Sequence, residues 1–254
     1  MVRMPVLFVG HGSPMNAIED NRHTRGWATI AARIPRPSAI LAISAHWTTP
    51  SVRTTDSLRP KVVYDMYGFP EELYQVHYQP PGDPALAHQL QTMLAGCQID
   101  NSWGIDHGTW SVLTHMYPQA DIPVVQISLD RQAARIFHFQ AGQALKPLRD
   151  QGILILGSGN VVHNLARINW NMADGYPWAV EFDQYIQDRI IAREYPQVVD
   201  YRSAGYSAEL AIPTTEHFDP LLYVLGATDP QDQVEIFNSA CLMGSLSMTS
   251  YLFQ

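Results

Sequence analysis

Short apolar runs alternate with segments of helical periodicity along the chain. Four of these runs are almost uniformly apolar, which is typical of strands that helices cover on both faces: residues 5–9, 39–44, 122–129 and 152–156. Near the end, residues 244–252 alternate in character, and we expect them to form a late antiparallel strand.

Helical patterns lie between these runs. Residues 131–148 repeat apolar side chains about every 3.6 positions, and residues 177–192 begin with a proline at a plausible first helical position. Further helices are expected at residues 83–94, 106–117, 160–167 and 221–226. Asp106, Asn160 and Asp219 stand where N-caps of three of them would lie. This alternation predicts an α/β fold, a single domain over residues 1–254 with a mostly parallel or mixed central sheet and helices on both faces.

Composition and charge narrow the range of partners. The chain has 254 residues, 46% of them apolar and 16% charged, as in an ordinary globular protein. Its formal net charge is −8, without a lysine or arginine cluster, so neither nucleic acid nor an anionic membrane surface is an expected partner. No apolar stretch approaches the length of a membrane span, and the N-terminal segment lacks a signal pattern. We therefore expect a cytoplasmic protein; the sequence does not indicate its oligomeric state.

The histidines mark a candidate site. Of the 10 histidines, His11 and His46 each follow an expected strand within two residues, and His163 follows the fourth through the turn at residues 157–160. In open α/β sheets, ligands bind outside the carboxyl ends of the strands, so these side chains are expected to meet there. The two cysteines, Cys97 and Cys241, form no thiolate cluster, and a metal site would therefore use nitrogen and oxygen ligands.

Two further features extend this candidate site. His163 and His107 fall in the first turns of the helices expected after Asn160 and Asp106, where the helix dipole disfavours imidazolium and keeps both rings neutral. Glu216 and His217 precede the apolar helix at 221–226. Adjacent side chains diverge, so only one of the two is expected to complete a metal site. The residues alone leave that choice open.

With these residues in view, the chain resembles the 4,5-DOPA extradiol dioxygenase family, a branch of the class III ring-cleaving dioxygenases. The resemblance rests on motifs that run in the family's order through nearly the whole chain: GHGSPM at 10–15, SAHW at 44–47, DHGTWSVL at 106–113, GSGNVVHNL at 157–165, Glu216-His217, PLLYVLG at 220–226 and MGSLSM at 243–248. Together they are highly specific.

The resemblance implies a metal-dependent enzyme that opens a catechol ring beside the diol with O2, giving a muconic semialdehyde. Fe(II) is the ion expected for activity, and Zn(II) is a plausible bound ion. His11, His46 and His217 match metal-binding positions. His163 matches a histidine that acts as acid and base and lies close enough to the metal to ligate it. His107 matches a histidine near the substrate.

Three aromatic side chains, Trp47, Trp110 and Tyr223, are candidates to line the pocket for the ring, although plain core packing would explain them equally well. Two other functions use the same residues. One is a zinc hydrolase, against which stands the absence of an HExxH motif and of a GxSxG elbow. The other is a non-enzymatic binding protein on the same scaffold.

Overall fold

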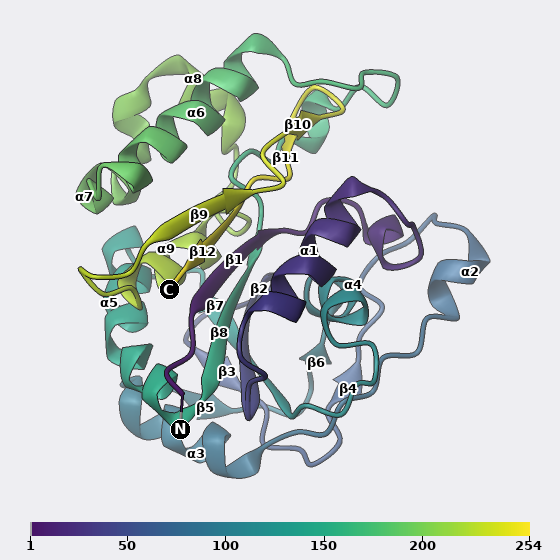
Figure 1. Cartoon of the computed structure of the whole chain (residues 1–254), viewed down its shortest axis with the longest axis vertical. Coiled ribbons are helices and arrows are strands. Elements are labelled where there is room, and N and C mark those ends of the chain that lie inside the picture. Colours follow the sequence, from purple (N-terminus) through teal and green to yellow (C-terminus); the bar gives the residue numbers. More distant parts are fainter. Residues whose placement is uncertain (1) are drawn as a thin grey trace.

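The computed structural model describes residues 2–254, which form a central sheet of eight strands with helices on both faces (Figure 1). The strand order across the sheet is β5-β3-β7-β2-β8-β1-β12-β9. The strands span β1 (Val6–Gly10), β2 (Ala39–Thr49), β3 (Arg53–Thr54), β5 (Gln98–Ile99), β7 (Val124–Asp130), β8 (Ile153–Gly159), β9 (Val234–Phe237) and β12 (Ser250–Phe253). Two small pairs lie apart from it: β4 (Lys61–Val62) with β6 (Gly104–Ile105), and β10 (Cys241–Leu242) with β11 (Leu246–Ser247).

The middle of the sheet is parallel and one edge is antiparallel. β7, β2, β8 and β1 run in the same direction, and β12 pairs antiparallel with both β1 and β9. The four parallel strands are the four apolar runs of the sequence, which confirms the predicted fold class. The late strand is shorter than expected, because the segment turns at Gly244 into β11 before β12 begins.

Helices cover both faces because successive strand residues point to opposite sides. Along β1, Val6 and Phe8 join one apolar cluster and Leu7 and Val9 join the other. The first cluster packs against α3 (Pro84–Met93), α5 (Arg135–Leu145), α6 (Pro177–Ile191) and α9 (Asp219–Gly226), and the second against α1 (Arg22–Arg33) and α4 (His107–Met116) (Figure 1). The remaining helical segments are short: α2 (Glu71–Tyr74), α7 (Tyr195–Val199), α8 (Tyr206–Ala211), and the 3-10 turns η1 (Pro14–Ala17), η2 (Lys146–Gln151), η3 (Leu165–Arg167) and η4 (Tyr201–Ala204).

Two predicted helix starts are wrong. The segment after Asn160 forms no α-helix and contains only the short 3-10 turn η3: the side chain of Asn160 donates to the carbonyl of Ser247 at 2.7 Å, and His163 forms an isolated bridge with Leu246. Here the tertiary hydrogen bonds to the β11 segment replace helical ones. α9 begins at Asp219 itself, with Phe218 as the N-cap, and the Asp219 carboxylate accepts from Thr215 instead of capping.

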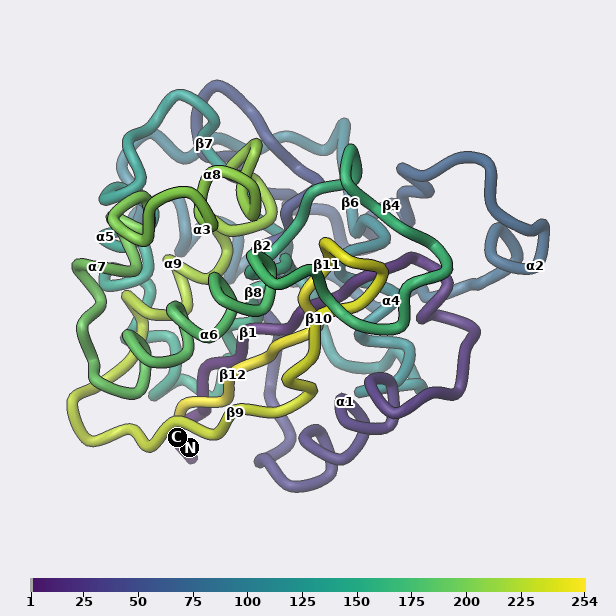
Figure 2. Tube along the Cα trace, turned by 90° about the horizontal axis from the view of Figure 1, so that it is seen from above, coloured from purple at the N-terminus to yellow at the C-terminus, as the bar shows by residue number. Residues whose placement is uncertain are grey.

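Segments distant in sequence lie side by side over one end of the sheet (Figure 2). The chain after β8 runs along the β10–β11 hairpin, where the Asn164 amide donates to Ser245 and the Tyr176 amide donates to Gly244. Within residues 2–254, no helix combines the length and the apolar character that a bilayer crossing requires.

The buried His23 of α1 predicts a loss of stability in acid. Burial, with the neighbouring Arg22 charge, lowers the pKa of His23 to about 4, against 6.5 for an ordinary histidine. Between these values the unfolded chain binds the proton and the folded chain does not, so His23 lowers stability progressively as the pH falls from 6.5 towards 4. In urea unfolding of metal-free protein, His23→Gln should lose about 1 kcal/mol less than wild type between pH 7.5 and pH 5. His88→Gln, at an exposed site on α3, is the control. An equal acid loss in the His23 and His88 variants would contradict the expectation.

Candidate metal centre

Five imidazoles meet at the carboxyl end of the parallel strands, where the order of strands reverses along the chain. His11 follows β1 directly, and its amide donates to the carbonyl of Gly159 at the end of β8, at 3.0 Å. This backbone bond continues the β1–β8 ladder by one residue. It places the His11 side chain over the sheet edge, as the sequence predicted.

His46 lies within β2 and not after it, because β2 continues to Thr49 through an irregularity. The register of β2 against β7 shifts between Ile43 and Thr48, as at a β-bulge, which re-aims a side chain. The hydroxyl of Ser44 donates to Asp106 at 2.6 Å and accepts from the His46 amide at 3.2 Å. The bulge that carries His46 is therefore tied to the start of α4.

His217 arrives from the loop before α9 and comes very close to the end of β8. Its carbonyl accepts from the Asn160 amide at 2.8 Å. A Cβ at Gly159 would stand 2.1 Å from the same carbonyl oxygen, so only glycine allows this approach. Gly159, which lies in the turn expected at residues 157–160, is therefore needed for close contact between two backbones.

His11, His46 and His217 form one set whose nitrogen atoms lie within 4.8 Å of one another. The Nε2 atoms of His11 and His46 are 3.2 Å apart. Each ring has a partner at Nδ1: Ser158 Oγ at 3.0 Å from His11, Asp65 at 3.2 Å from His46 and Glu216 at 3.1 Å from His217. The Ser158 hydroxyl donates to the Gly108 carbonyl, so it accepts from His11. Nδ1 of each ring therefore carries the proton and leaves the Nε2 lone pair free for a cation.

The sequence reading missed Asp65, which lies in the segment between β4 and α2. One carboxylate oxygen lies 3.2 Å from Nδ1 of His46, and the other lies 3.0 Å from Nδ1 of His107. It also accepts from the His107 amide at 3.0 Å. Asp65 thus fixes two imidazoles with one carboxylate. No sequence signal pointed to it, since Asp65 follows no strand of the main sheet and belongs to none of the motifs.

Asp106 has a different function from the expected N-cap. It occupies the N-cap position of α4, but its side chain caps no helix amide. The buried carboxylate instead accepts from Ser44, from Gln126 and from the Trp103 indole. It therefore joins β2, β7 and α4 beneath the histidines.

His163 lies at the same site but in a second set. Its ring stacks face to face on His217, with centroids 3.4 Å apart and planes 6° from parallel. It shares a potential ligand group with Glu216 and His217, whereas His11 and His46 share another group with His217. Among residues 2–254 no side chain hydrogen-bonds to its ring. The expectation that His163 ligates the metal therefore stays a prediction.

Burial keeps most of these rings neutral. It lowers the pKa of His11 and of His217 well below 6.5, with the neighbouring imidazoles adding to the effect, and it lowers the pKa of His163 to about 4. Burial also lowers the pKa of His107. The helix dipole expected for His163 is absent, so burial is the cause there. Neutral imidazole is the form that binds a metal ion.

Carboxylates supply the charge of the site. Burial alone would raise the pKa of Asp65, but its hydrogen bonds with His107 and His46 hold that pKa well below the ordinary value. Burial would likewise lower the pKa of His46, yet the same bond to Asp65, together with nearby Asp106, raises it. Asp65 is therefore ionised beside the imidazoles, which favours a cation among them.

The histidines line a cavity of about 440 Å³ whose outer wall is apolar. Met66, Phe69, Leu165, Ile168 and Trp170 are among the residues that form it. The three aromatic candidates of the sequence do not line it: Trp110 and Tyr223 are fully buried in the two cores, and Trp47 stacks on Trp103. Aromatic residues on long helices and strands here serve packing, whereas the cavity wall comes from connecting segments.

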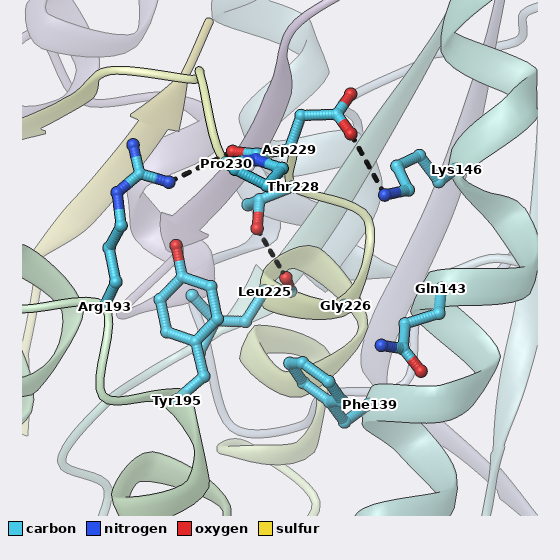
Figure 3. A pocket seen from close by; sticks show the side chains of 10 residues that line it. All are labelled: Phe139, Gln143, Lys146, Arg193, Tyr195, Leu225, Gly226, Thr228, Asp229 and Pro230. Atoms are coloured by element: carbon cyan, nitrogen blue, oxygen red, sulfur yellow. Dashed lines mark hydrogen bonds and ion pairs between the residues drawn. The ribbon is translucent and has the colours of Figure 1, made fainter.

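A second hollow, of about 290 Å³, lies between α5, the end of α9 and the turn after α6 (Figure 3). Its charged side chains bond within the wall: Lys146 pairs with Asp229 at 3.0 Å, and Arg193 donates to the Asp229 carbonyl at 3.1 Å. No histidine lines it. This hollow therefore offers no candidate metal ligand set of imidazoles.

Comparison with known proteins agrees with this geometry. The family described as the catalytic LigB subunit of aromatic ring-opening dioxygenase matches residues 5–254. The chain belongs to this family. It is 45% identical to a protein of Escherichia coli K12 named 4,5-DOPA dioxygenase extradiol, over 98% of this chain and 94% of that protein. A protein of the same name from Beta vulgaris is 39% identical, over 97% and 95%.

A solved structure matches as well. The crystal structure of the uncharacterized protein JW3007 from Escherichia coli K12 superimposes with a TM-score of 0.88 at 42% identity, covering 99% of this chain and 100% of that one. The family and these relatives make the chain a metal-dependent extradiol ring-cleaving dioxygenase. They do not favour the two alternatives, a zinc hydrolase and a non-enzymatic binding protein.

The orientation of His46 and His107 by Asp65 leads to a prediction. Asp65→Asn preserves shape but removes the negative charge and one acceptor, so both rings lose their fixed tautomer. Affinity for Zn(II), measured by competition with a chelating dye, should fall about 10- to 100-fold. Asp20→Asn, at an exposed carboxylate on the surface, serves as the control. Unchanged affinity in Asp65→Asn would show that the carboxylate does not support the site.

Proposed function

We propose that the protein opens the ring of a DOPA-like catechol with O2 at a divalent metal ion held by His11, His46 and His217. One observation carries the proposal: each of these three rings has a polar partner at Nδ1 and presents Nε2 to the same space. Three imidazole lone pairs facing one another without a proton or a cation would repel. A metal ion relieves that repulsion, so the residues fit the group.

Whether Glu216 is a metal ligand affects which metal ion the site prefers. Its carboxylate bonds to Nδ1 of His217 and accepts from Thr214 at 2.8 Å, so we assign it to the support of His217 and not to the metal. Oxygen-activating Fe(II) sites often use two histidines and one carboxylate, whereas three histidines also suit zinc. We propose Fe(II) as the active ion and Zn(II) as an ion that the same rings bind. The metal, when bound, lowers the pKa of the catechol hydroxyls and brings the diol and O2 together.

His163 is the proposed acid and base. It lines the cavity, it is neutral at pH 7 because burial lowers its pKa to about 4, and no side chain of residues 2–254 fixes its ring by a hydrogen bond. A neutral, unattached imidazole accepts a proton from a catechol hydroxyl and returns it to the product. Stacking on His217 holds the ring plane at the metal side of the cavity.

His107 is the proposed substrate contact. Its Nδ1 is held by Asp65, and its ring lies 3.9 Å from that of His46, centroid to centroid. The other ring nitrogen is therefore available to the bound catechol or oxygen. We also propose a cytoplasmic location, since both thiols, Cys97 and Cys241, are free and buried and suit a reducing compartment.

The first test is anaerobic loading with Fe(II), then addition of DOPA and air. Oxygen uptake and a new visible absorbance from a ring-opened semialdehyde should appear together with Fe(II) and not with Zn(II). His46→Ala should lose both signals and most of the bound metal, because one of three ligands is gone. His88→Ala, on the exposed face of α3, should keep both. If no catechol in a small panel consumes oxygen, the proposed function is wrong.

A substitution of His163 tests its proposed role in proton transfer separately from metal binding. His163→Asn should bind Fe(II) to the same extent as wild type but lower kcat about 100-fold or more, because the proton acceptor is lost. Metal content by elemental analysis and turnover by oxygen electrode would be measured on the same sample. Loss of metal in parallel with activity would instead make His163 a ligand, as the family resemblance also allowed.

A further inference from the structure

The loop that leads from His11 to η1 carries two parts of the site. His11 itself belongs to the proposed ligand set, and residues 12–14 line the cavity. The ring and the amide of His11 are both held by residues at the end of β8. Neither contact holds the chain beyond the His11 carbonyl, and Gly12 follows with φ at +65°, where glycine leaves the backbone freest. The rest of the loop must therefore be held from elsewhere.

The side chain of Asn16 supplies that support. Its Nδ2 donates to the His11 carbonyl at 2.9 Å, and its Oδ1 accepts from Nδ2 of Asn21 at 2.9 Å. The partners fix this orientation of the amide, because the His11 carbonyl can only accept and Asn21 uses its own oxygen to cap α1. Asn16 is only 6% exposed, so both bonds are largely shielded from water.

The backbone of Asn16 is anchored as well. Its amide donates to the Ser13 carbonyl at 3.0 Å, and its carbonyl accepts from Nε2 of His115 at 2.6 Å. His115 lies in the last turn of α4. All four polar groups of Asn16 are therefore bonded, and they connect the loop after β1 with the start of α1 and with the end of α4.

Helix α4 consequently supports His11 from two sides. At its start, the Gly108 carbonyl accepts from the Ser158 hydroxyl, which in turn accepts from Nδ1 of His11. At its end, His115 holds Asn16, and Asn16 holds the His11 carbonyl. One helix thus sets both the ring of His11 and the peptide that follows it. Without the second contact, that peptide would be free to rotate, and the ring would lose one of its constraints.

We propose that Asn16 is a positioning residue for the metal centre, which acts through the His11 carbonyl. Asn16 does not line the cavity, so it is neither a ligand nor a substrate contact. The proposal rests on the metal ligands of the proposed function. Residues that orient a metal ligand commonly contribute about 10- to 100-fold to metal affinity, and Asn16 orients His11 from the side of the backbone.

Asn16→Ala tests this role, because it removes the bond to the His11 carbonyl without a change of charge. Affinity for Zn(II), measured by competition with a chelating dye, should fall at least about tenfold. The visible ligand-field spectrum of the Co(II)-loaded protein should differ from that of wild type in band position and intensity, since it reports the arrangement of ligands around the ion. Neither measurement depends on turnover.

Asn238→Ala is the matched control. The side chain of Asn238 also donates to a backbone carbonyl at 2.9 Å, that of His23 in α1, and Asn238 does not line the cavity. Both variants lose a bond of the same kind, so both should unfold at lower urea concentration than wild type. Only Asn16→Ala should alter the Zn(II) affinity and the Co(II) spectrum.

Asn16→Asp separates the two side-chain bonds of Asn16. The carboxylate still accepts from Asn21, but it cannot donate to the His11 carbonyl and repels it. The added negative charge by itself favours a nearby cation, so a fall in Zn(II) affinity in this variant would report lost geometry. We expect such a fall. This variant also decides the question if Asn16→Ala does not fold.

The outcomes separate the positioning role from the proposed function. Wild-type Zn(II) affinity in Asn16→Ala, or in Asn16→Asp should the first not fold, would overturn the role of Asn16. An equal fall in Asn238→Ala would overturn it too, because the effect would then be one of overall stability. If wild type binds neither Zn(II) nor Co(II), the proposed metal site fails together with the role of Asn16. Failure of Fe(II)-loaded protein to consume oxygen with catechols would remove ring cleavage alone.

Discussion

The site depends on how closely three backbones approach at the end of β8. The amide of His11 donates to Gly159, and the amide of Asn160 donates to His217, so β1, β8 and the loop before α9 meet through main-chain hydrogen bonds. Gly159 makes this possible because a Cβ would collide with the His217 carbonyl. Backbone contacts of this kind are stiffer than side-chain contacts. They fix two imidazoles relative to one another before any metal binds.

The residues that contact the imidazoles from behind set which ring nitrogen is free to bind a cation. Ser158, Asp65 and Glu216 each hold one Nδ1, which decides that Nε2 is the free atom of every ring in the set. Burial keeps His11 and His217 neutral, and the ionised Asp65 offers compensating charge for a cation. His163 lacks such a partner within residues 2–254. The same pocket therefore contains three oriented rings suited to a metal, the His163 ring suited to a proton, and the His107 ring beside Asp65.

The residues that line the cavity come from the sheet, from helix starts and from connecting segments. At the inner end, only His46 lies within a strand. His11 directly follows β1, His163 follows β8, His107 begins α4 and His217 lies in the loop before α9. The outer wall is built by the stretches before α2 and after β8, which carry Phe69, Leu165 and Trp170. Asp65 and His163 lie in these same stretches, so the outer wall and the rings at the inner end are built by shared segments.

The sequence by itself determined the four parallel strands of the core and the placement of three histidines at the strand ends. Uniform apolar runs marked the four central strands, because strands buried on both faces leave no polar alternation, and His11, His46 and His163 could be assigned to the strand ends by position alone. Their motifs also indicated the family. Only the tertiary structure decided what depends on contacts between distant segments. Asp65 reaches two imidazoles from a connecting segment, His217 approaches through Gly159, and Glu216 turns to Nδ1 of His217. The chain after Asn160 follows β11 instead of forming a helix. Local periodicity indicates which face of an element is buried. The contacts between particular side chains depend on backbone pairing and hydrogen bonds between distant segments, which local periodicity does not contain.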